Sequence, residues 1–147
     1  MDGLVTIEVD ELNLSAQLTS LDLSGNSVGV EGAGLLASAL LQNATLTDLS
    51  LANCDISEGC FSLTEALKEN RFLTQLNLES NSLGDMSSAK ILDSLSKNSA
   101  LTSLSVGGNK FSSTSIMSLM GKAAGGTLYQ LQVAIEQAHA SLISATL

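Results

Sequence analysis

Hydrophobic and polar positions alternate in five short segments that recur along the chain. The segments LTSLDLSGN, LTDLSLANC, LTQLNLESN and LTSLSVGGN begin at Leu18, Leu46, Leu73 and Leu101, and a shorter copy, LYQLQV, begins at Leu128. Successive starts are 28, 27, 28 and 27 residues apart. Self-similarity at such a fixed period is the signature of a repeat architecture, in which each unit is one supersecondary element.

Each segment has the form L-x-x-L-x-L-x-x-N/C. Alternation with a period of two predicts a short strand with one buried face. We expect these strands to be parallel and to be centred near Leu21, Leu49, Leu76 and Leu104. A polar residue closes each segment and can bond backbone groups where the chain leaves the strand. These residues are expected to form a ladder along the stack: Asn26, Cys54, Asn81 and Asn109.

The second half of each unit changes to helical spacing. Its apolar stripe is formed by Leu36, Ala39 and Leu40, then Leu63, Ala66 and Leu67, then Ile91, Ser94 and Leu95. Asn43, Asn70 and Asn98 mark the helix ends, where we expect the left-handed conformation that asparagine tolerates. Met86, Met117 and Met120 fall in turn or helix segments and are predicted to fill gaps in the core.

These phased copies resemble the leucine-rich repeat family, in its ribonuclease-inhibitor-like class with 28-residue units. The resemblance implies an α/β fold, a short right-handed horseshoe-shaped solenoid with a parallel sheet on its concave face and helices on its convex face. We expect a single domain over residues 1–147. Residues 1–17 would form a truncated N-terminal cap repeat, 18–127 four repeats, and 128–147 a C-terminal capping strand and helix.

Charge and composition limit the classes of partner that the chain can bind. The chain has 15 acidic residues against six basic ones, a net charge of −9, which disfavours nucleic acid and anionic membranes. The N-terminus carries acidic residues instead of the basic start of a secretory signal, and no apolar run is long enough to span a bilayer. Two cysteines are too few for a disulfide framework, so we expect a cytoplasmic protein.

The inventory of reactive side chains predicts no enzyme, no cofactor and no metal. The single histidine, His139, falls in the last helical stretch, away from any nucleophile. Cys54 and Cys60 have neither C-x-x-C spacing nor a second pair, so a zinc site is not expected. Cys60 opens a helix, where packing in the core is the simpler interpretation.

The family resemblance implies that partners bind the concave strand face. Small, polar and mildly acidic residues occupy its outward positions, which favours a protein partner with a basic or polar contact segment. The predicted partner-binding residues are Asp22, Asp48, Gln75, Asn77, Glu79, Tyr129 and Gln130. The face lacks the Trp, Tyr and Arg residues that dominate interface hot spots. The alternative that these side chains are only solvated and that the partner binds another surface is therefore left open.

We predict an intracellular protein-interaction module or scaffold. Two alternatives share the repeat class: a regulator of a GTPase, similar to the Ran-type GTPase-activating proteins, and a tropomodulin-like actin-capping repeat domain. The sole arginine, Arg71, falls at a helix-to-strand connection instead of the concave face, which argues against a supplied arginine finger.

Overall fold

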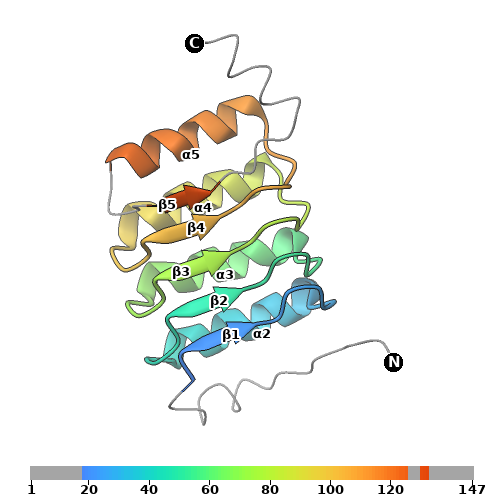
Figure 1. Ribbon diagram of the computed structural model, residues 1–147, viewed down its shortest axis with the longest axis vertical. Coiled ribbons are helices and arrows are strands. Elements are labelled where there is room, and N and C mark those ends of the chain that lie inside the picture. Colours follow the sequence, from blue (N-terminus) through green and yellow to red (C-terminus); the bar gives the residue numbers. More distant parts are fainter. Residues whose placement is uncertain (1–17, 126–129, 133–147) are drawn as a thin grey trace.

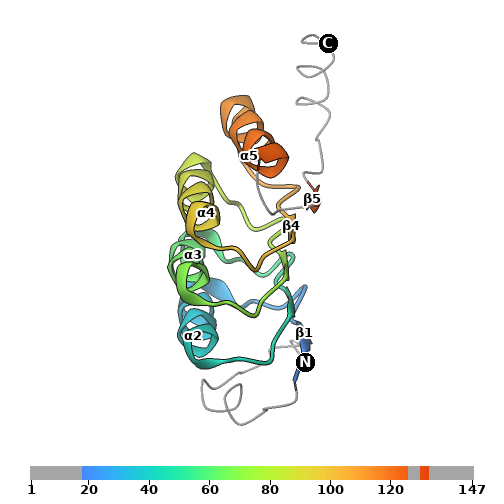
Figure 2. The same ribbon diagram turned by 90° about the vertical axis from the view of Figure 1, so that its left-hand side faces the viewer.

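Strands lie along one side of the molecule and helices along the other (Figures 1 and 2). The computed structural model describes residues 18–125 and 130–132, and the expected cap at residues 1–17 and most of the one at 128–147 lie outside these ranges. The strands are β1 (Ser20–Asp22), β2 (Asp48–Ser50), β3 (Gln75–Asn77), β4 (Ser103–Ser105) and β5 (Gln130–Gln132). All neighbours pair in parallel, in chain order, which confirms the predicted parallel sheet.

One helix follows each of the first four strands. These helices are α2 (Gly29–Gln42), α3 (Cys60–Glu69), α4 (Asp85–Lys97) and α5 (Ser113–Gly125), and the short 3-10 helix η1 (Ser57–Gly59) leads into α3. Each strand–helix unit therefore repeats the previous one, as the sequence period predicts. The central leucines of the strands stand in register, with Leu21 paired to Leu49, Leu49 to Leu76, and Leu76 to Leu104.

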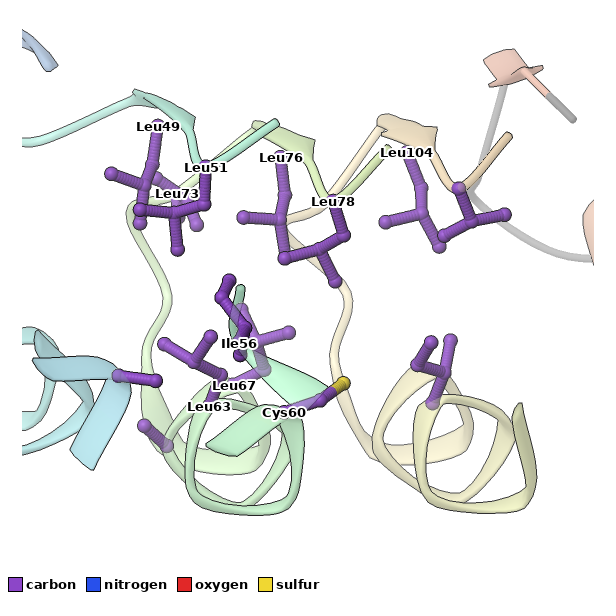
Figure 3. Close-up of a cluster of buried hydrophobic side chains, with 14 of the residues drawn as sticks. Leu49, Leu51, Ile56, Cys60, Leu63, Leu67, Leu73, Leu76, Leu78 and Leu104 are labelled. Carbon is purple, nitrogen blue, oxygen red and sulfur yellow. The ribbon is translucent and has the colours of Figure 1, made fainter. Parts of the chain in front are cut away.

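An aliphatic core fills the space between the two layers. Leucines from the strands, such as Leu49 and Leu76, point toward Leu63 and Leu67 on α3 (Figure 3). All four are almost completely buried. Complete burial of one leucine contributes about 1.5–3 kcal/mol, so the repeated leucines provide the main stabilisation of the stack. Alternation places them on one face of each strand and leaves the opposite face to polar residues.

The polar residues that close the strands form the expected ladder. Asn81 accepts hydrogen bonds from the backbone N–H groups of Cys54 (2.9 Å) and Ile56 (3.2 Å), and its amide donates to the carbonyl of Leu51 (2.7 Å). Asn109 makes the same bonds one repeat later. Cys54 can only copy the donor half, through a bond from its thiol to the carbonyl of Leu23 (3.1 Å).

The residue before each rung of the ladder has a left-handed backbone. Gly25, Asn53, Ser80 and Gly108 all have φ between 53° and 80°. The first and last of these positions carry glycine, which adopts this conformation without steric cost. At Gly108 an added Cβ would also come within 2.6 Å of the Ser80 hydroxyl, so the close stacking of the two units favours glycine there.

The prediction for the helix ends is wrong in its geometry. Asn43, Asn70 and Asn98 have φ between −91° and −70° and an extended backbone, not a left-handed one. They instead form a second ladder. The amide of Asn70 donates to the carbonyl of Leu40 (2.8 Å) in the preceding unit, and its oxygen accepts from the N–H groups of Phe72 and Leu73. Their role is therefore to satisfy buried backbone groups between repeats.

The prediction for the methionines is also wrong. Met86, Met117 and Met120 are 68%, 59% and 46% exposed. They lie on the outer sides of α4 and α5, where the apolar stripe of each helix has already been supplied by other residues. The sequence placed them in turn or helix segments without showing which side of a helix they occupy, and all three lie on helices.

A carboxylate joins α5 to the unit before it. Asp85, in the first turn of α4, accepts hydrogen bonds from the backbone N–H of Ser112 (2.8 Å) and the hydroxyl of Ser115 (2.7 Å). These bonds, with the Ser112 amide first, lower the pKa of Asp85. The contact satisfies donors at the start of α5 that have no partner within that helix.

Candidate functional site: the outward face of the strands

We use the name strand face for the outward side chains of β1 to β4 together with the residue two positions beyond each strand. Pairing aligns these residues in rows across the repeats. The rows are Ser20, Asp48, Gln75 and Ser103; Asp22, Ser50, Asn77 and Ser105; and Ser24, Ala52, Glu79 and Gly107. Adjacent strands are about 4.8 Å apart. A partner segment lying across the strands can therefore contact several rows at once.

The structure brings together most of the predicted site residues. Asp22, Asp48, Gln75, Asn77 and Glu79 all lie on the strand face and are exposed or half-buried. Gln130 is the first residue of β5 and pairs with Ser103, at the expected position in its row. Tyr129 lies outside the described residues.

Two of these residues have local structural roles. Asp22 accepts a hydrogen bond from the backbone N–H of Ser24 (2.9 Å), and Asn77 accepts one from the backbone N–H of Glu79 (2.9 Å). Hydrogen bonds from Ser24, its hydroxyl first and its amide second, lower the pKa of Asp22. The Ser24 and Ser50 hydroxyls are 2.7 Å apart, which links the first two repeats. The bonds of Asp22 and Asn77 fix the turns at the ends of β1 and β3.

The other two acidic residues are uncompensated. Among the described residues, no hydrogen bond or ion pair reaches the carboxylate of Asp48 or of Glu79. Glu79 lies one strand away from Asp48 and four residues further along, a separation of about 14 Å at the usual strand spacings. Basic residues are absent from the rows of the strand face. Two separated negative charges therefore face solvent there.

The side chains with reactive potential are placed as structural residues. Cys54 and Cys60 are free and buried, and burial raises the pKa of the Cys60 thiol to about 12. Arg71 lies after α3 and donates to the carbonyl of Lys68 (2.8 Å), so it is at the predicted connection and not on the strand face. In residues 18–125 and 130–132, no three His, Cys, Asp or Glu side chains are grouped to hold a metal ion. His139 lies outside the described residues.

No helix in the described part of the chain is long and apolar enough to cross a membrane.

The helices carry a feature that the sequence analysis did not predict, a charged network across α3 and α4. Lys68 contacts Glu65 on its own helix (2.7 Å) and Asp93 on the next (2.6 Å), and Lys97 lies 3.6 Å from Asp93. Glu65 and Asp93 both stand five residues before the helix-end asparagine, a signal that could have revealed the network.

Comparison with known proteins finds the leucine-rich repeat that the strand–helix units show. A leucine-rich repeat family model matches residues 11–37, 42–63 and 69–86. The ribonuclease inhibitor of Mus musculus is 40% identical over 86 residues, which is 57% of this chain and 19% of the inhibitor. The human NACHT, LRR and PYD domains-containing protein 5 is 45% identical over 76 residues, 50% of this chain and 6% of that protein. The chain thus spans about a fifth or less of these relatives.

Two solved structures share the fold at low sequence identity. Leiomodin-1 Actin-Binding Site 2 superposes with a TM-score of 0.77 at 20% identity, over 94% of this chain and 83% of that one. The C-terminal domain of tropomodulin from Caenorhabditis elegans gives 0.74 at 18% identity, over 95% and 90%. Together with the period of 27–28 residues and the strand–helix units, these findings identify the chain as a leucine-rich repeat protein of the ribonuclease-inhibitor-like class.

Proposed function

We propose that the chain is a protein-interaction module whose strand face receives a partner segment rich in lysine or arginine. The observation that carries the proposal is the pair of uncompensated carboxylates, Asp48 and Glu79, on a face without basic residues. A basic partner would gain mainly in association rate, and that gain would weaken with added salt. A module with this role works by binding, without catalysis or a cofactor, and we propose that it acts in the cytoplasm.

Small residues around the two carboxylates support a polypeptide partner. Ser20, Ser50 and Ser103 leave the surface low, and Gln75 and Asn77 offer amide groups between the charges. An extended segment could therefore approach the sheet closely and exchange hydrogen bonds with several repeats. The lack of large aromatic anchors points to a modest affinity, with charge and hydrogen bonding supplying most of the specificity.

The relatives suggest two partners for a first test. The mouse relative is by its name an inhibitor of ribonuclease, and the leiomodin-1 structure is by its title an actin-binding site. The superposition of the structural neighbours supports the fold alone, because their identity is only 18–20%, and actin is therefore a candidate partner only. We find no motif in this chain that favours the Ran-type GTPase-activating role, since the one arginine is bound to a helix end.

The test is a comparative capture from native lysate with three forms of the chain as bait. The first is the wild type, the second carries Asp48→Asn and Glu79→Gln, and the third carries Glu31→Gln and Glu58→Gln. The last two lose the same charge, but Glu31 lies in the first turn of α2 and Glu58 lies in η1, away from the strand face. Captured proteins are identified by mass spectrometry, with ribonuclease and actin added as defined probes.

We expect at least one protein to be captured by the wild type and the control but lost with the strand-face variant. Its affinity for the variant should fall about three- to ten-fold at low ionic strength and less at high ionic strength. Equal capture by all three forms would contradict the proposal, because it would mean that total charge or another face mediates binding.

A further inference from the structure

A groove separates α2 from α3 on the helix side of the molecule, away from the strand face. It has a volume of about 320 Å³, and its floor and walls are formed mostly by small residues, among them Gly34, Ala37 and Ala66. Leu41 of α2 and Glu65 of α3 line the same groove. Ser38 and Ser62 complete the lining, so the groove is mainly apolar, with two hydroxyls and one carboxylate.

Leu41, the largest apolar residue that lines this groove, is exposed in a way that the repeat does not require. It is 55% exposed. Counted back from the asparagine that ends each helix, Leu41 corresponds to Lys68 in α3 and Ser96 in α4. The other units thus carry a charged or polar residue at this position and fold in the same way. The exposed leucine in α2 therefore leaves apolar surface in water and adds nothing to the packing of the stack.

The next pair of helices, α3 and α4, carries an ion pair at the positions that Leu41 and Glu65 occupy in α2 and α3. Between α3 and α4, Lys68 reaches across to Asp93 (2.6 Å). The residues at the equivalent positions between α2 and α3 are Leu41 and Glu65, so the acid is kept and the cation is replaced by a leucine. Glu65 instead bonds Lys68 of its own helix, on the side away from α2, and shares that cation with Asp93.

We propose that the α2–α3 groove binds an amphipathic helix of a partner protein. The apolar side chains of that helix would cover Leu41 and the small residues of the groove, and a lysine or arginine would take the cross-groove position beside Glu65. The lining of the groove favours such a partner, because its residues include one carboxylate, Glu65, and no basic side chain. The small residues on the floor let a helix approach closely. The proposal concerns a different face from the strand face and does not depend on the function proposed for it.

The probe is a capped 18-residue helical peptide with leucine at positions i, i+3, i+4 and i+7, two lysines beside that face, and alanine or glutamine elsewhere. A scrambled peptide of the same composition, without a continuous apolar face, is its matched control. Each is titrated into isotopically labelled protein, and amide chemical shifts are followed by NMR. The variant Leu41→Lys copies the Lys68–Asp93 pair between α3 and α4, so it should fold normally and close the site. The variant Asp48→Asn with Glu79→Gln controls for binding at the strand face.

We expect the amphipathic peptide to shift amides of α2 and α3 around Gly34, Ser38, Ser62 and Ala66, and the scrambled peptide to leave them unchanged. Leu41→Lys should weaken this binding at least about ten-fold, and Glu65→Gln about three-fold. The strand-face variant should bind the peptide at the groove as the wild type does.

Three results would overturn the proposal. The first is an absence of groove shifts at millimolar peptide, and the second is equal shifts with the scrambled peptide. The third is self-association of the wild type in sedimentation velocity that Leu41→Lys abolishes, because this would assign the groove to a second copy of the chain.

Discussion

Replacing Asn81 with alanine should destabilise the fold far more than replacing the residue at the same position one unit earlier, Cys54. Asn81 closes β3 and is buried, with its oxygen and its amide both bonded to backbone groups of the second and third units. The alanine variant removes all these bonds at once. Since the exchange creates a small cavity only, the loss should come almost entirely from unsatisfied backbone groups.

The magnitude follows from counting those groups. Without the side chain, the N–H groups of Cys54 and Ile56 lose their acceptor and the carbonyl of Leu51 loses its donor. The carbonyl of Glu79 keeps its bond from the N–H of Asn53 (2.8 Å) and is not counted. Each buried unsatisfied group costs about 1–3 kcal/mol, and water can reach part of this turn, so we expect a total loss of about 3–6 kcal/mol.

Cys54→Ala is the internal control. Its thiol makes a weak bond to the carbonyl of Leu23, and the backbone nearby already bonds in another way, since Val28 N–H donates to the carbonyl of Asn26 (2.9 Å). We expect a loss of about 1–2 kcal/mol, from the weak bond and the lost packing of sulfur. Asn81→Cys should fall between the two alanine variants, because it restores one donor and no acceptor.

The assay is urea unfolding followed by far-UV circular dichroism, with m-values compared to show that the same surface unfolds. If Asn81→Ala is already unfolded without urea, the loss of folding free energy is at least as large as the stability of the wild type. Equal losses for Asn81→Ala and Cys54→Ala would refute the reasoning, because the acceptor half of the asparagine would then contribute nothing.

Three further predictions concern the core, α5 and the thiols. Leu49→Ala should cost about 2–5 kcal/mol in the same urea assay, whereas Leu35→Ala, at a half-exposed position, should change stability by less than about 1 kcal/mol. Because the pKa of Asp85 is lowered in the folded state, its contribution to stability is present above the pKa of the unfolded state and is lost as pH falls through the folded pKa. Amide hydrogens of α5 should therefore exchange faster in Asp85→Ala than in the wild type at pH 7. This difference should vanish at acidic pH. Cys60, with a pKa near 12, should react with a thiol reagent at pH 8 only after unfolding, and rapid labelling of the folded chain would contradict its buried position.

The strands and helices could be predicted from the sequence because burial is imposed by position in the repeat. Alternation at Leu49 and Leu51 and spacing at Leu63, Ala66 and Leu67 each identify one buried face, and the structure buries all five. A period of 27 or 28 residues then fixes the register of neighbouring strands. The sequence pattern therefore determined the architecture of the described units.

The role of the helix-end asparagines could not be predicted in the same way. Asparagine at the end of a helix is compatible with a left-handed cap and with an extended residue that bonds the next turn. The choice depends on whether carbonyls of the preceding unit are within reach, as that of Leu40 is for Asn70. That distance is a property of the stacked repeats, which one unit of sequence does not contain.

The candidate surfaces were predictable in part. The outward positions of the strands follow from the alternation, so Asp48 and Glu79 could be placed on one face from the sequence. Asp22 is bonded to Ser24, whereas Asp48 and Glu79 have no such bond. This difference depends on side-chain geometry and could not be predicted from the sequence. Likewise, the sequence did not indicate that Leu41 takes the place of a cation, because the ion pair of Lys68 on α3 with Asp93 on α4 depends on how neighbouring helices stack.

The central claim is that a protein partner binds the strand face, and site-specific photo-crosslinking tests it most directly. A photoreactive phenylalanine derivative would replace Gln75, which is exposed at the centre of the strand face, or Ala89, which is exposed on α4 away from the α2–α3 groove. Each form is irradiated with the partner that the strand-face variant fails to capture. The account predicts a covalent complex from position 75 and none from position 89. Crosslinking from position 89 alone would contradict it.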